Sequence, residues 1–361
     1  MLPLPTLLVY IRLSISFVTG DCEMNQLARV SNVISDVVDR GLVYAIANYR
    51  IDTPYPLDVE ENWGFWTDPK PAWLENFAKT SPPEEKRKAY LEKMLARDHA
   101  IGIEAHYDVS NEFYALFLDT RYRFYTCARF LSEDETLEQA QQNKAEYLRS
   151  LLNLSGHEKV LDLGCGWGSM LKFLQNSGHS GGLSGFTLSK EQLAYARKEL
   201  GFNVFLKDFV SDAFENEPYD RIISIGSLEH VKPHELKGLY QKMYHALTPG
   251  GLAVHQFFSF NSESYPASAM ILQMFFLGSL LALHSEHIQA AESAGFKITC
   301  DSLDDYKPTL RAWYKRLAAN QDKALELVGL KTYNHYMTFF PIAWLFFQHQ
   351  EATLHRMVME K

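Results

Sequence analysis

The sequence predicts an α/β protein with a Rossmann-like, doubly wound sheet, a helical region before the sheet, and a helical insert and C-terminal cap after it. Between residues 159 and 259, short apolar runs alternate with segments of helical period, which is typical of βαβ units in a mostly parallel sheet. A glycine-rich turn, GCGWG, follows the first of these runs. The chain has 361 residues and is 47% hydrophobic, which is enough for one large core or two modest ones.

The composition excludes several classes of protein. It fits neither collagen nor a disulfide-stapled miniprotein nor a disordered chain. Acidic residues outnumber basic ones by 44 to 35, and the formal charge of -9 argues against nucleic acid as a partner. The four cysteines are far apart and form no C-x-x-C pair, so we expect no metal site, no disulfide framework and a reducing, cytoplasmic location.

The part of the chain before the sheet is expected to be mainly helical. Residues 1–24 form an apolar tail with a central arginine and no basic start, so we expect a disordered tail, with a membrane or export segment as the alternative. Residues 25–130 form the helical N-terminal region. In it, an amphipathic helix or helix pair ends near Ile51, an irregular aromatic loop occupies residues 52–83, and a charged helix follows at 83–100.

The elements of the sheet follow in order. Residues 106–130 combine polar turn residues with an aromatic run, which predicts a helix and then a loop that crosses a site. Residues 137–154 form an amphipathic helix whose early acidic and late basic residues suit the helix dipole. Five strands, with helices between them, are expected at 159–163, 181–189, 202–209, 220–231 and 252–259. Ligands of such sheets bind at the carboxyl ends of the strands.

Beyond Phe260 the expected structure is helical. The apolar run 270–283 is too short to span a bilayer, so we expect a core-facing helix or an active-site lid, with shallow membrane contact as the alternative. The tail from Asp304 to Lys361 is expected to be helical and aromatic-rich, with residues 339–347 packed against the sheet.

The segment VLDLGCGWG carries the first chemical signal. Its glycines let a cofactor lie against the main chain at a helix N-terminus. The spacing G-x-G-x-G differs from the G-x-G-x-x-G of dinucleotide sites, and with Asp162 before the turn it resembles motif I of class I S-adenosylmethionine-dependent methyltransferases. FTLSKEQ, KDF and LTPGG resemble further motifs of that class, so NAD binding is the weaker alternative. The resemblance implies S-adenosylmethionine as cofactor, held by Asp162, Gly164, Gly166, Thr187, Gln192 and Asp208.

Several ordered motifs narrow this resemblance to the cyclopropane-fatty-acid synthase family. They are HYDVSNEFYALFLDTRYRFYTCARF, LEQAQQNK, DLGCGWG, FTLSKEQ, SLEHV and YKPTLRAWYKR, over about residues 100–315. Relatives in the family include mycolic acid synthases, methyl-branching fatty-acid methyltransferases and coclaurine-type N-methyltransferases. The resemblance implies a methyltransferase domain over residues 131–361, with an acceptor-binding insert at about 260–340.

The family also implies a catalytic set. Its cyclopropane synthases hold a bicarbonate ion, which acts as the base, with side chains that match Cys127, Glu229, His255 and Tyr306. Tyr125 and Thr126 are expected to reach the cofactor, as a tyrosine–serine pair does in relatives. N-methyltransferases of the family carry an extra glutamate three residues before the Glu-His pair, where this chain has Gly226, so carbon methylation is favoured.

The expected activity is therefore methylation of an unsaturated fatty acyl chain, in a phospholipid, to give a cyclopropane. An isolated alkene is a poor nucleophile, so the site must align it with the methyl donor and shelter the resulting cation. Residues 1–95 match the family poorly, so the acceptor is less well specified than the cofactor. The alternatives are a methyl-branching fatty-acid methyltransferase, a small-molecule N- or C-methyltransferase acting on an alkaloid, terpene or polyketide, and a lipid-binding protein without catalysis. Peripheral membrane contact and a homodimer are further expectations.

Overall fold

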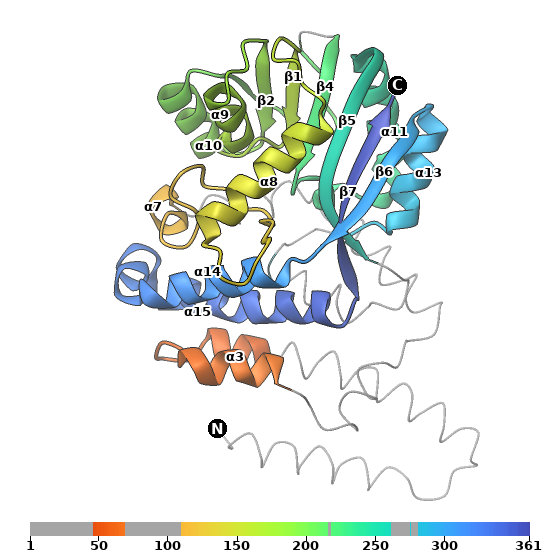
Figure 1. Ribbon diagram of the computed structural model, residues 1–361. Helices are drawn as coiled ribbons and strands as arrows, with labels where there is room; N and C mark the ends of the chain where they lie inside the picture. The colour runs from red at the N-terminus through yellow and green to blue at the C-terminus, as the bar shows by residue number, and fades with distance from the viewer. Residues whose placement is uncertain (1–45, 69–109, 216–217, 261–274, 276–280) are drawn as a thin grey trace, which may run out of the picture.

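In the computed structural model of the chain, the described residues are 46–68, 110–215, 218–260, 275 and 281–361 (Figure 1). They contain a seven-stranded sheet with the strand order β3-β2-β1-β4-β5-β7-β6. Strands β1 to β5 run parallel, and β7 pairs antiparallel with both β5 and β6. The strands are β1 (Val160–Leu163), β2 (Leu183–Thr187), β3 (Asn203–Leu206), β4 (Tyr219–Ile225), β5 (Leu247–Phe260), β6 (Lys297–Asp304) and β7 (Ala352–Glu360).

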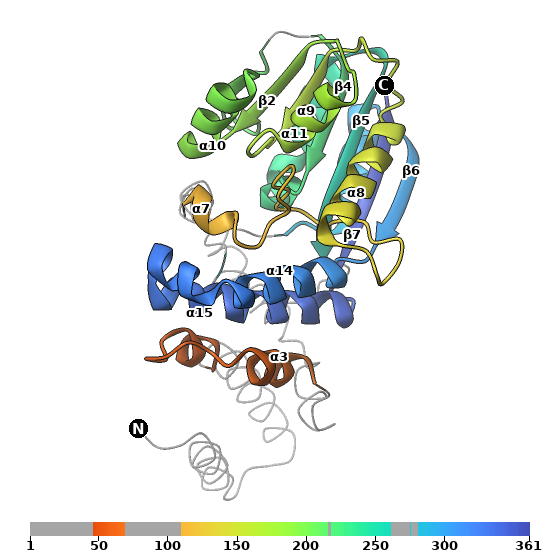
Figure 2. The ribbon, with the colours of Figure 1, turned by 60° about the vertical axis from the view of Figure 1, so that its left-hand side comes forward.

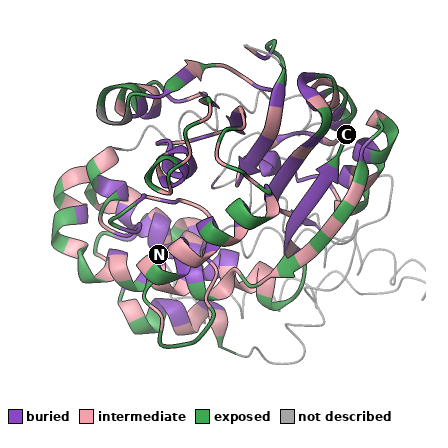
Figure 3. Cartoon of the chain, turned by 45° about the horizontal axis from the view of Figure 1, so that its top comes forward, coloured by how far each residue is buried: buried purple, intermediate pink, exposed green. Residues whose placement is uncertain are grey.

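Helices cover both faces of the sheet. They are α8 (Leu137–Leu151), α9 (Ser169–Asn176), α10 (Lys190–Tyr195), α11 (Pro233–Ala246) and α13 (His284–Ala294). Helices α8 and α9 pack over Ile223 and Val254, whereas α11 and α13 pack over Ile222 and Ala253. Successive residues of one strand thus enter opposite cores, as the two-residue period of a strand requires. Figure 3 shows the buried residues concentrated along the strands and on the inner sides of the helices.

A second group of helices lies beyond the carboxyl end of the sheet (Figures 1 and 2). It consists of α3 (Val59–Thr67), α14 (Lys307–Ala319) and α15 (Gln321–Gln348), and the short α7 (Asn111–Tyr114) packs against it. Asn62 of α3 donates a hydrogen bond from Nδ2 to the carbonyl of Met337 at 2.8 Å. The hydroxyl of Tyr314 donates to the carbonyl of Val59 at 2.6 Å. These buried bonds fix α3 to the other two helices, and the group forms a cap over the end of the sheet where ligands of such folds bind.

The predicted fold class is confirmed. All five predicted strands are present and parallel, with helices α9, α10 and α11 between them. The predicted helix end at Ile51 is also observed, and the predicted helix over residues 137–154 is α8. The turn before α8 is stable because Thr136 and Gln139 form a reciprocal capping box.

Two predictions were wrong. Helix α3 forms inside the segment 52–83 that was expected to be an irregular loop, because the prolines of that segment lie outside α3 and Asp58 caps its first turn. The chain beyond Phe260 is not wholly helical either, because Lys297–Asp304 form β6 and the last residues of the tail form β7, which inserts between β5 and β6. Residues 339–347 lie in α15, where Ile342 belongs to the same buried cluster as Phe260 and Ala352 at the ends of β5 and β7, as expected.

Other expectations fall on parts of the chain that are not described. They concern the tail 1–24, the helix up to residue 45, the charged helix at 83–100 and nearly all of the apolar run 270–283. Within the described ranges, no helix is both long enough and apolar enough to cross a bilayer.

Candidate active site

A cavity with an empty volume of about 990 Å³ opens at the carboxyl ends of β1, β2, β3 and β4. Its walls come from these strand ends and from the loop that precedes α8. The eight residues that the sequence assigned to the cofactor all line it: Tyr125, Thr126, Asp162, Gly164, Gly166, Thr187, Gln192 and Asp208. The fold therefore gathers residues from separate segments of the chain on one concave surface.

The loop of residues 122–126 forms one wall of this cavity and is held by buried side chains. The carboxylate of Asp119 accepts hydrogen bonds from the first three N–H groups of the loop, at 2.6 to 3.1 Å. Gln141 of α8 donates from Nε2 to the carbonyl oxygens of Phe124 and Thr126, at 3.3 and 2.9 Å. These bonds satisfy main-chain groups that belong to no helix or strand, so the loop keeps one conformation.

Asp162 is a buried acid on the wall of the cavity. It is 2% exposed, and its Oδ1 has no hydrogen-bond partner among the described residues. Burial raises the pKa of Asp162 to about 7, and the nearby ammonium of Lys144 opposes the rise. An unpaired buried acceptor beside an open cavity suits an N–H donor or a cationic group of a bound ligand. The aminoacyl end of S-adenosylmethionine carries such a group, so this acid fits the cofactor.

The ends of β2 and β3 add polar groups to the cavity. Thr187 donates from Oγ1 to Oε1 of Gln192 at 2.8 Å. Gln192 lies in the first turn of α10, which is capped by the side chain of Ser189. After β3, the carboxylate of Asp208 accepts a hydrogen bond from the N–H of Val210 at 2.8 Å, which turns the chain at the cavity rim.

Two glycines in the cavity wall leave no room for a side chain. Gly164 has φ of +79°, and a Cβ there would lie 2.4 Å from Cβ of Ser227. Gly226 has φ of +67°, and a Cβ there would lie 2.4 Å from Cγ2 of Thr126. Only glycine adopts this backbone conformation at no steric cost, and only glycine permits these contacts. The strand ends can therefore approach one another closely around the cavity.

A second cavity, with an empty volume of about 830 Å³, adjoins the first. Three residues, Tyr125, Gly226 and His230, line both. The rest of its wall is almost wholly apolar and comes mainly from β5, α14 and α15, including Phe258, Leu310, Trp313, Phe339, Ile342 and Phe346. The first cavity has many polar side chains and adjoins a second, apolar one beneath the helical cap, and we refer to them as the polar and the apolar cavity.

Two of the four predicted catalytic residues, Glu229 and Tyr306, line the apolar cavity. Burial raises the pKa of Glu229 to about 8, although its own main-chain N–H and that of Phe258 oppose this, so the carboxyl is protonated at neutral pH. Its Oε2 has no hydrogen-bond partner in the described part of the chain. The ring of Tyr306 packs on Phe347, with 5.0 Å between the ring centroids. A protonated carboxyl and a phenol are both hydrogen-bond donors.

The other two, Cys127 and His255, line neither cavity. The thiol of Cys127 donates to the carbonyl of Ala128, with 3.2 Å between Sγ and O, and burial raises its pKa to about 12. His255 points to the face of β5 that packs on α11, where its ring lies 6.1 Å from that of Tyr240. Burial lowers the pKa of His255 to about 3, and neither ring nitrogen has a hydrogen-bond partner among the described residues. Both groups are therefore uncharged at neutral pH.

Two residues at the site were not predicted from the sequence. His230, next to Glu229, lies where the two cavities meet. Lys144 lies on the buried face of α8, among Ala140, Ala145 and other apolar residues. A lysine at a buried position of an amphipathic helix is rare without a partner, and that position was the available signal.

The chain is similar to proteins of known families. The family described as mycolic acid cyclopropane synthetase matches residues 95–357. The probable fatty acid methyltransferase of Pseudomonas putida is 32% identical over 252 residues, which cover 65% of this chain and 63% of that protein. The methoxy mycolic acid synthase MmaA3 of Mycobacterium tuberculosis is 30% identical over 266 residues, which cover 68% of this chain and 89% of that protein.

A solved structure shares the fold. Mycolic acid cyclopropane synthase CmaA1, in complex with SAH and CTAB, matches with a TM-score of 0.67 and 26% identity, over 73% of this chain and 99% of that one. The residues matched by the family include nearly all of the sheet, both cavities and much of the helical cap. The chain spans less than two thirds of the length of the Pseudomonas putida relative.

Proposed function

The chain belongs to the mycolic acid cyclopropane synthetase family and is an S-adenosylmethionine-dependent methyltransferase, and we propose that it converts an unsaturated fatty acyl chain of a phospholipid to a cyclopropane chain, with bicarbonate as the base. The observation that carries this proposal is the junction of the two cavities at Tyr125, Gly226 and His230. An apolar acceptor in the second cavity would meet the cofactor in the first at this junction.

The polar cavity would hold the cofactor. S-adenosylmethionine, when bound, supplies an electrophilic methyl group. Asp162 offers the unpaired Oδ1 to a cationic donor, and Gln192 and Asp208 offer side-chain polar groups at the neighbouring strand ends. Lys144 favours the ionised form of Asp162, which strengthens its attraction for a cation.

The apolar cavity would hold the acyl chain. Its aromatic walls stabilise positive charge through their π faces without forming a bond to it, as a carbocation on the acyl chain requires. They also exclude water that would capture such a cation. Glu229 is neutral at neutral pH and Gly226 carries no side chain, so the junction lacks a fixed negative charge that would favour an amine substrate.

The base is assigned to bicarbonate held by Glu229 and Tyr306. When bound, bicarbonate supplies the group that accepts a proton from the acceptor. The protonated carboxyl of Glu229, with its unpaired Oε2, and the phenol of Tyr306 are donors that suit an anion in an apolar wall. Cys127 and His255 lie outside the cavity lining, so for them a role at the anion remains a prediction of the family resemblance alone.

The proposal is tested by lipid analysis of a cyclopropane-free bacterial host that expresses the full chain and is fed methyl-deuterated methionine. An acyl chain that gains a single carbon and keeps two of the three methyl deuteriums is the expected product, because ring closure removes one of them. The Glu229→Leu variant keeps a neutral side chain of similar length but removes its hydrogen-bond donor, and we expect a loss of product of about a hundredfold. Glu292→Leu, at an exposed position of α13, is the matched control.

The same experiment distinguishes ring closure from the main alternative, which is methyl branching. A product that keeps all three deuteriums is a methyl branch, and it would contradict ring closure. Unchanged lipids from a well-expressed, cofactor-binding protein would contradict the lipid acceptor and leave the small-molecule acceptors.

A further inference from the structure

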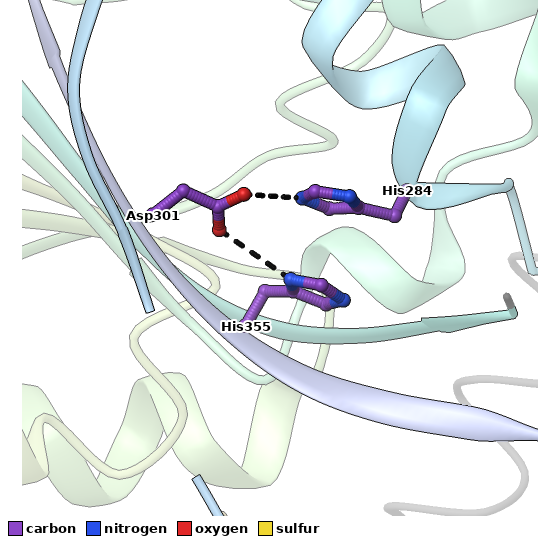
Figure 4. A group of neighbouring side chains, drawn as sticks. All are labelled: His284, Asp301 and His355. Atoms are coloured by element: carbon purple, nitrogen blue, oxygen red, sulfur yellow. Dashed lines mark hydrogen bonds and ion pairs between the residues drawn. The ribbon is translucent and has the colours of Figure 1, made fainter. Parts of the chain in front are cut away.

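A cluster of two histidines and an aspartate lies where the start of α13 meets strands β6 and β7 at the edge of the sheet. Nε2 of His284 is 2.9 Å from Oδ2 of Asp301, and Nδ1 of His355 is 3.4 Å from Oδ1 of the same carboxylate (Figure 4). The potential ligand atoms of the three side chains all lie within 4.8 Å of one another. None of the three residues lines either cavity, so the cluster is separate from the site of the proposed methyl transfer.

The three residues come from three elements that the fold places side by side. His284 is the first residue of α13, Asp301 lies on the edge strand β6, and His355 lies on its neighbour β7. The side chain of His355 is 7% exposed, whereas those of His284 and Asp301 are 24% and 29% exposed. The cluster therefore has a fixed, buried base and an open side through which an ion can enter from solvent.

The orientation of His355 suits a ligand. Its Nε2 lies 2.8 Å from Oγ1 of Thr353, two residues earlier on β7. In one tautomer Nδ1 donates a hydrogen bond to Oδ1 of Asp301 at 3.4 Å, and in the other Nε2 donates to the hydroxyl of Thr353 and leaves the lone pair of Nδ1 for an ion. Histidines that bind metals are commonly fixed in this way, with the second ring nitrogen bonded to a neighbouring polar group.

His284 and Asp301 have no better partners within the described residues. The contact from Nε2 of His284 to the carboxylate is short, but Nε2 has no hydrogen-bond partner, because the oxygen lies off the direction that a ring N–H requires. The ion pairs of Asp301 are with the two imidazoles alone, and both are neutral in the tautomers that offer lone pairs. A cation between these atoms would pair the carboxylate and satisfy Nε2 of His284, and it would replace the hydrogen bond between Nδ1 of His355 and Asp301.

We propose that His284, Asp301 and His355 bind a divalent transition-metal ion, with Zn²⁺ as the reference ion. Two imidazoles and a carboxylate are a ligand set typical of Zn²⁺, and imidazole nitrogens disfavour Ca²⁺ and Mg²⁺, which take oxygen ligands. With metal–ligand distances of about 2.0 to 2.2 Å, ligand atoms around a tetrahedral ion are about 3.3 to 3.6 Å apart. The nitrogen–oxygen distance to His355, 3.4 Å, lies in this range, and that to His284, 2.9 Å, is shorter. Water would complete the coordination on the open side.

Metal binding requires one local movement. The two imidazole rings are stacked, with 3.7 Å between centroids and 10° between planes, so their lone pairs lie in two separate, nearly parallel planes and do not meet at one ion. His355 is held by Thr353, whereas the partly exposed His284 can turn about its side-chain bonds. We therefore expect the ion to separate the stacked rings by moving His284.

The test uses the full chain without an affinity tag, stripped of metal by a chelator. Calorimetric titration with Zn²⁺ should show a single saturable site per chain, and Co²⁺ should give the visible absorption of a low-coordinate nitrogen and oxygen site that Zn²⁺ abolishes. His284→Gln and Asp301→Asn should each weaken Zn²⁺ binding at least about tenfold, and Thr353→Val, which leaves the three ligands in place, by about tenfold. His349→Gln, an exposed histidine at the end of α15, should bind as the native chain does.

The Zn²⁺ titrations measure metal binding without any methyl-transfer assay, so their result does not depend on the proposed function. Thermal unfolding of the metal-free variants shows whether they fold, and His284→Gln is the less disruptive change because its side chain is partly exposed. No saturable Zn²⁺ binding by the native chain would overturn the proposal. So would folded His284→Gln and Asp301→Asn variants that bind Zn²⁺ within about twofold of the native affinity, since the ion would then lie elsewhere.

Discussion

The ammonium of Lys144 donates a 2.7 Å hydrogen bond to Oγ1 of Thr126, which lines the candidate cofactor cavity. The nitrogen also lies 3.5 Å from the ring centroid of Phe124, and the side chain is fully buried on α8. Its charge lowers the pKa of Asp162, against the larger effect of burial. Burial lowers the pKa of Lys144 well below its ordinary value, whereas the nearby carboxylates of Asp119 and Asp162 raise it. This buried amine thus links the loop before α8 to the acid on β1, although it lines no cavity itself.

Replacing Lys144 with Met should therefore weaken cofactor binding more than it weakens the fold. Without the cation, the pKa of Asp162 rises further above 7, so less of the acid is ionised at neutral pH. We expect the affinity for S-adenosylhomocysteine to fall about tenfold near pH 7 and to recover at higher pH. Stability should change little, because a buried charge and its desolvation cost are removed together. Calorimetry across pH measures both effects, with the exposed Lys237→Met as control. An unchanged pH profile would contradict the link to Asp162.

The close contact between Gly226 and Thr126 predicts a clash that a second mutation relieves. Gly226→Ala places a Cβ at 2.4 Å from Cγ2 of Thr126, so the loop must move, and we expect the affinity for S-adenosylhomocysteine to fall at least about tenfold. Gly178→Ala is the matched control, because Gly178 also has positive φ but no atom within 4 Å of the added Cβ. It should cost about 1 kcal/mol of stability and leave binding intact. Adding Thr126→Ser, which deletes Cγ2 and keeps the hydroxyl, should restore part of the binding. Equal loss in both glycine variants would show that strain, and not the contact, is responsible.

The apolar cavity predicts a change that affects the acceptor alone. Ala343 lines this cavity from α15 and is absent from the cofactor cavity. Ala343→Phe should fill part of the space and raise the KM for vesicles of monounsaturated phospholipid about tenfold, while binding of S-adenosylhomocysteine stays within about twofold. Ala319→Phe, at the exposed end of α14, controls for the added ring. If both variants retain the native KM, the acyl chain lies elsewhere.

Contiguous patterns were the part of the fold that could be predicted from the sequence. The apolar run at Val160–Leu163 and its following glycines lie on one strand and turn, so local periodicity was sufficient. Strand β7 was missed because His355 and Arg356 interrupt its apolar pattern. Both are buried and contact residues distant in the chain. Gln256 accepts a hydrogen bond from Nε of Arg356 at 2.9 Å, Asp304 accepts another from its guanidinium, and His355 contacts Asp301. Burial of this kind is decided by tertiary contacts.

The candidate site likewise has parts that follow from one short motif and parts that depend on tertiary contacts. Asp162, Gly164 and Gly166 belong to one short motif, and the structure places them in one cavity. Glu229 and Tyr306 are far apart in sequence and nevertheless line the second cavity together. His255 is on the predicted strand, but whether its side chain faces the cavity depends on the register of β5, and the residue pairs with Ser224 and Met357 so that its ring faces α11. The sequence pattern alone did not show to which side of the sheet the side chain of His255 points.

The protonation of Glu229 gives a prediction with a defined sign. Its pKa is about 8 in the folded chain and near 4.5 when unfolded, so between these values the folded state binds the extra proton and stability falls as pH rises. The buried His255 and His287 have lowered pKa values, and they make stability rise with pH up to about their ordinary pKa. A comparison with Glu229→Gln cancels these histidine contributions, because both proteins contain them.

We therefore expect the unfolding free energy of the native chain, relative to Glu229→Gln, to fall by about 1 kcal/mol between about pH 7 and about pH 8.5. Urea unfolding at three pH values measures it, and the exposed Glu292→Gln should show no such change. A difference that stays constant with pH would mean that Glu229 is already ionised at neutral pH. An ionised carboxylate has no proton to donate and would repel bicarbonate, so that result would remove Glu229 from the proposed anion site and favour a cationic acceptor at the same position.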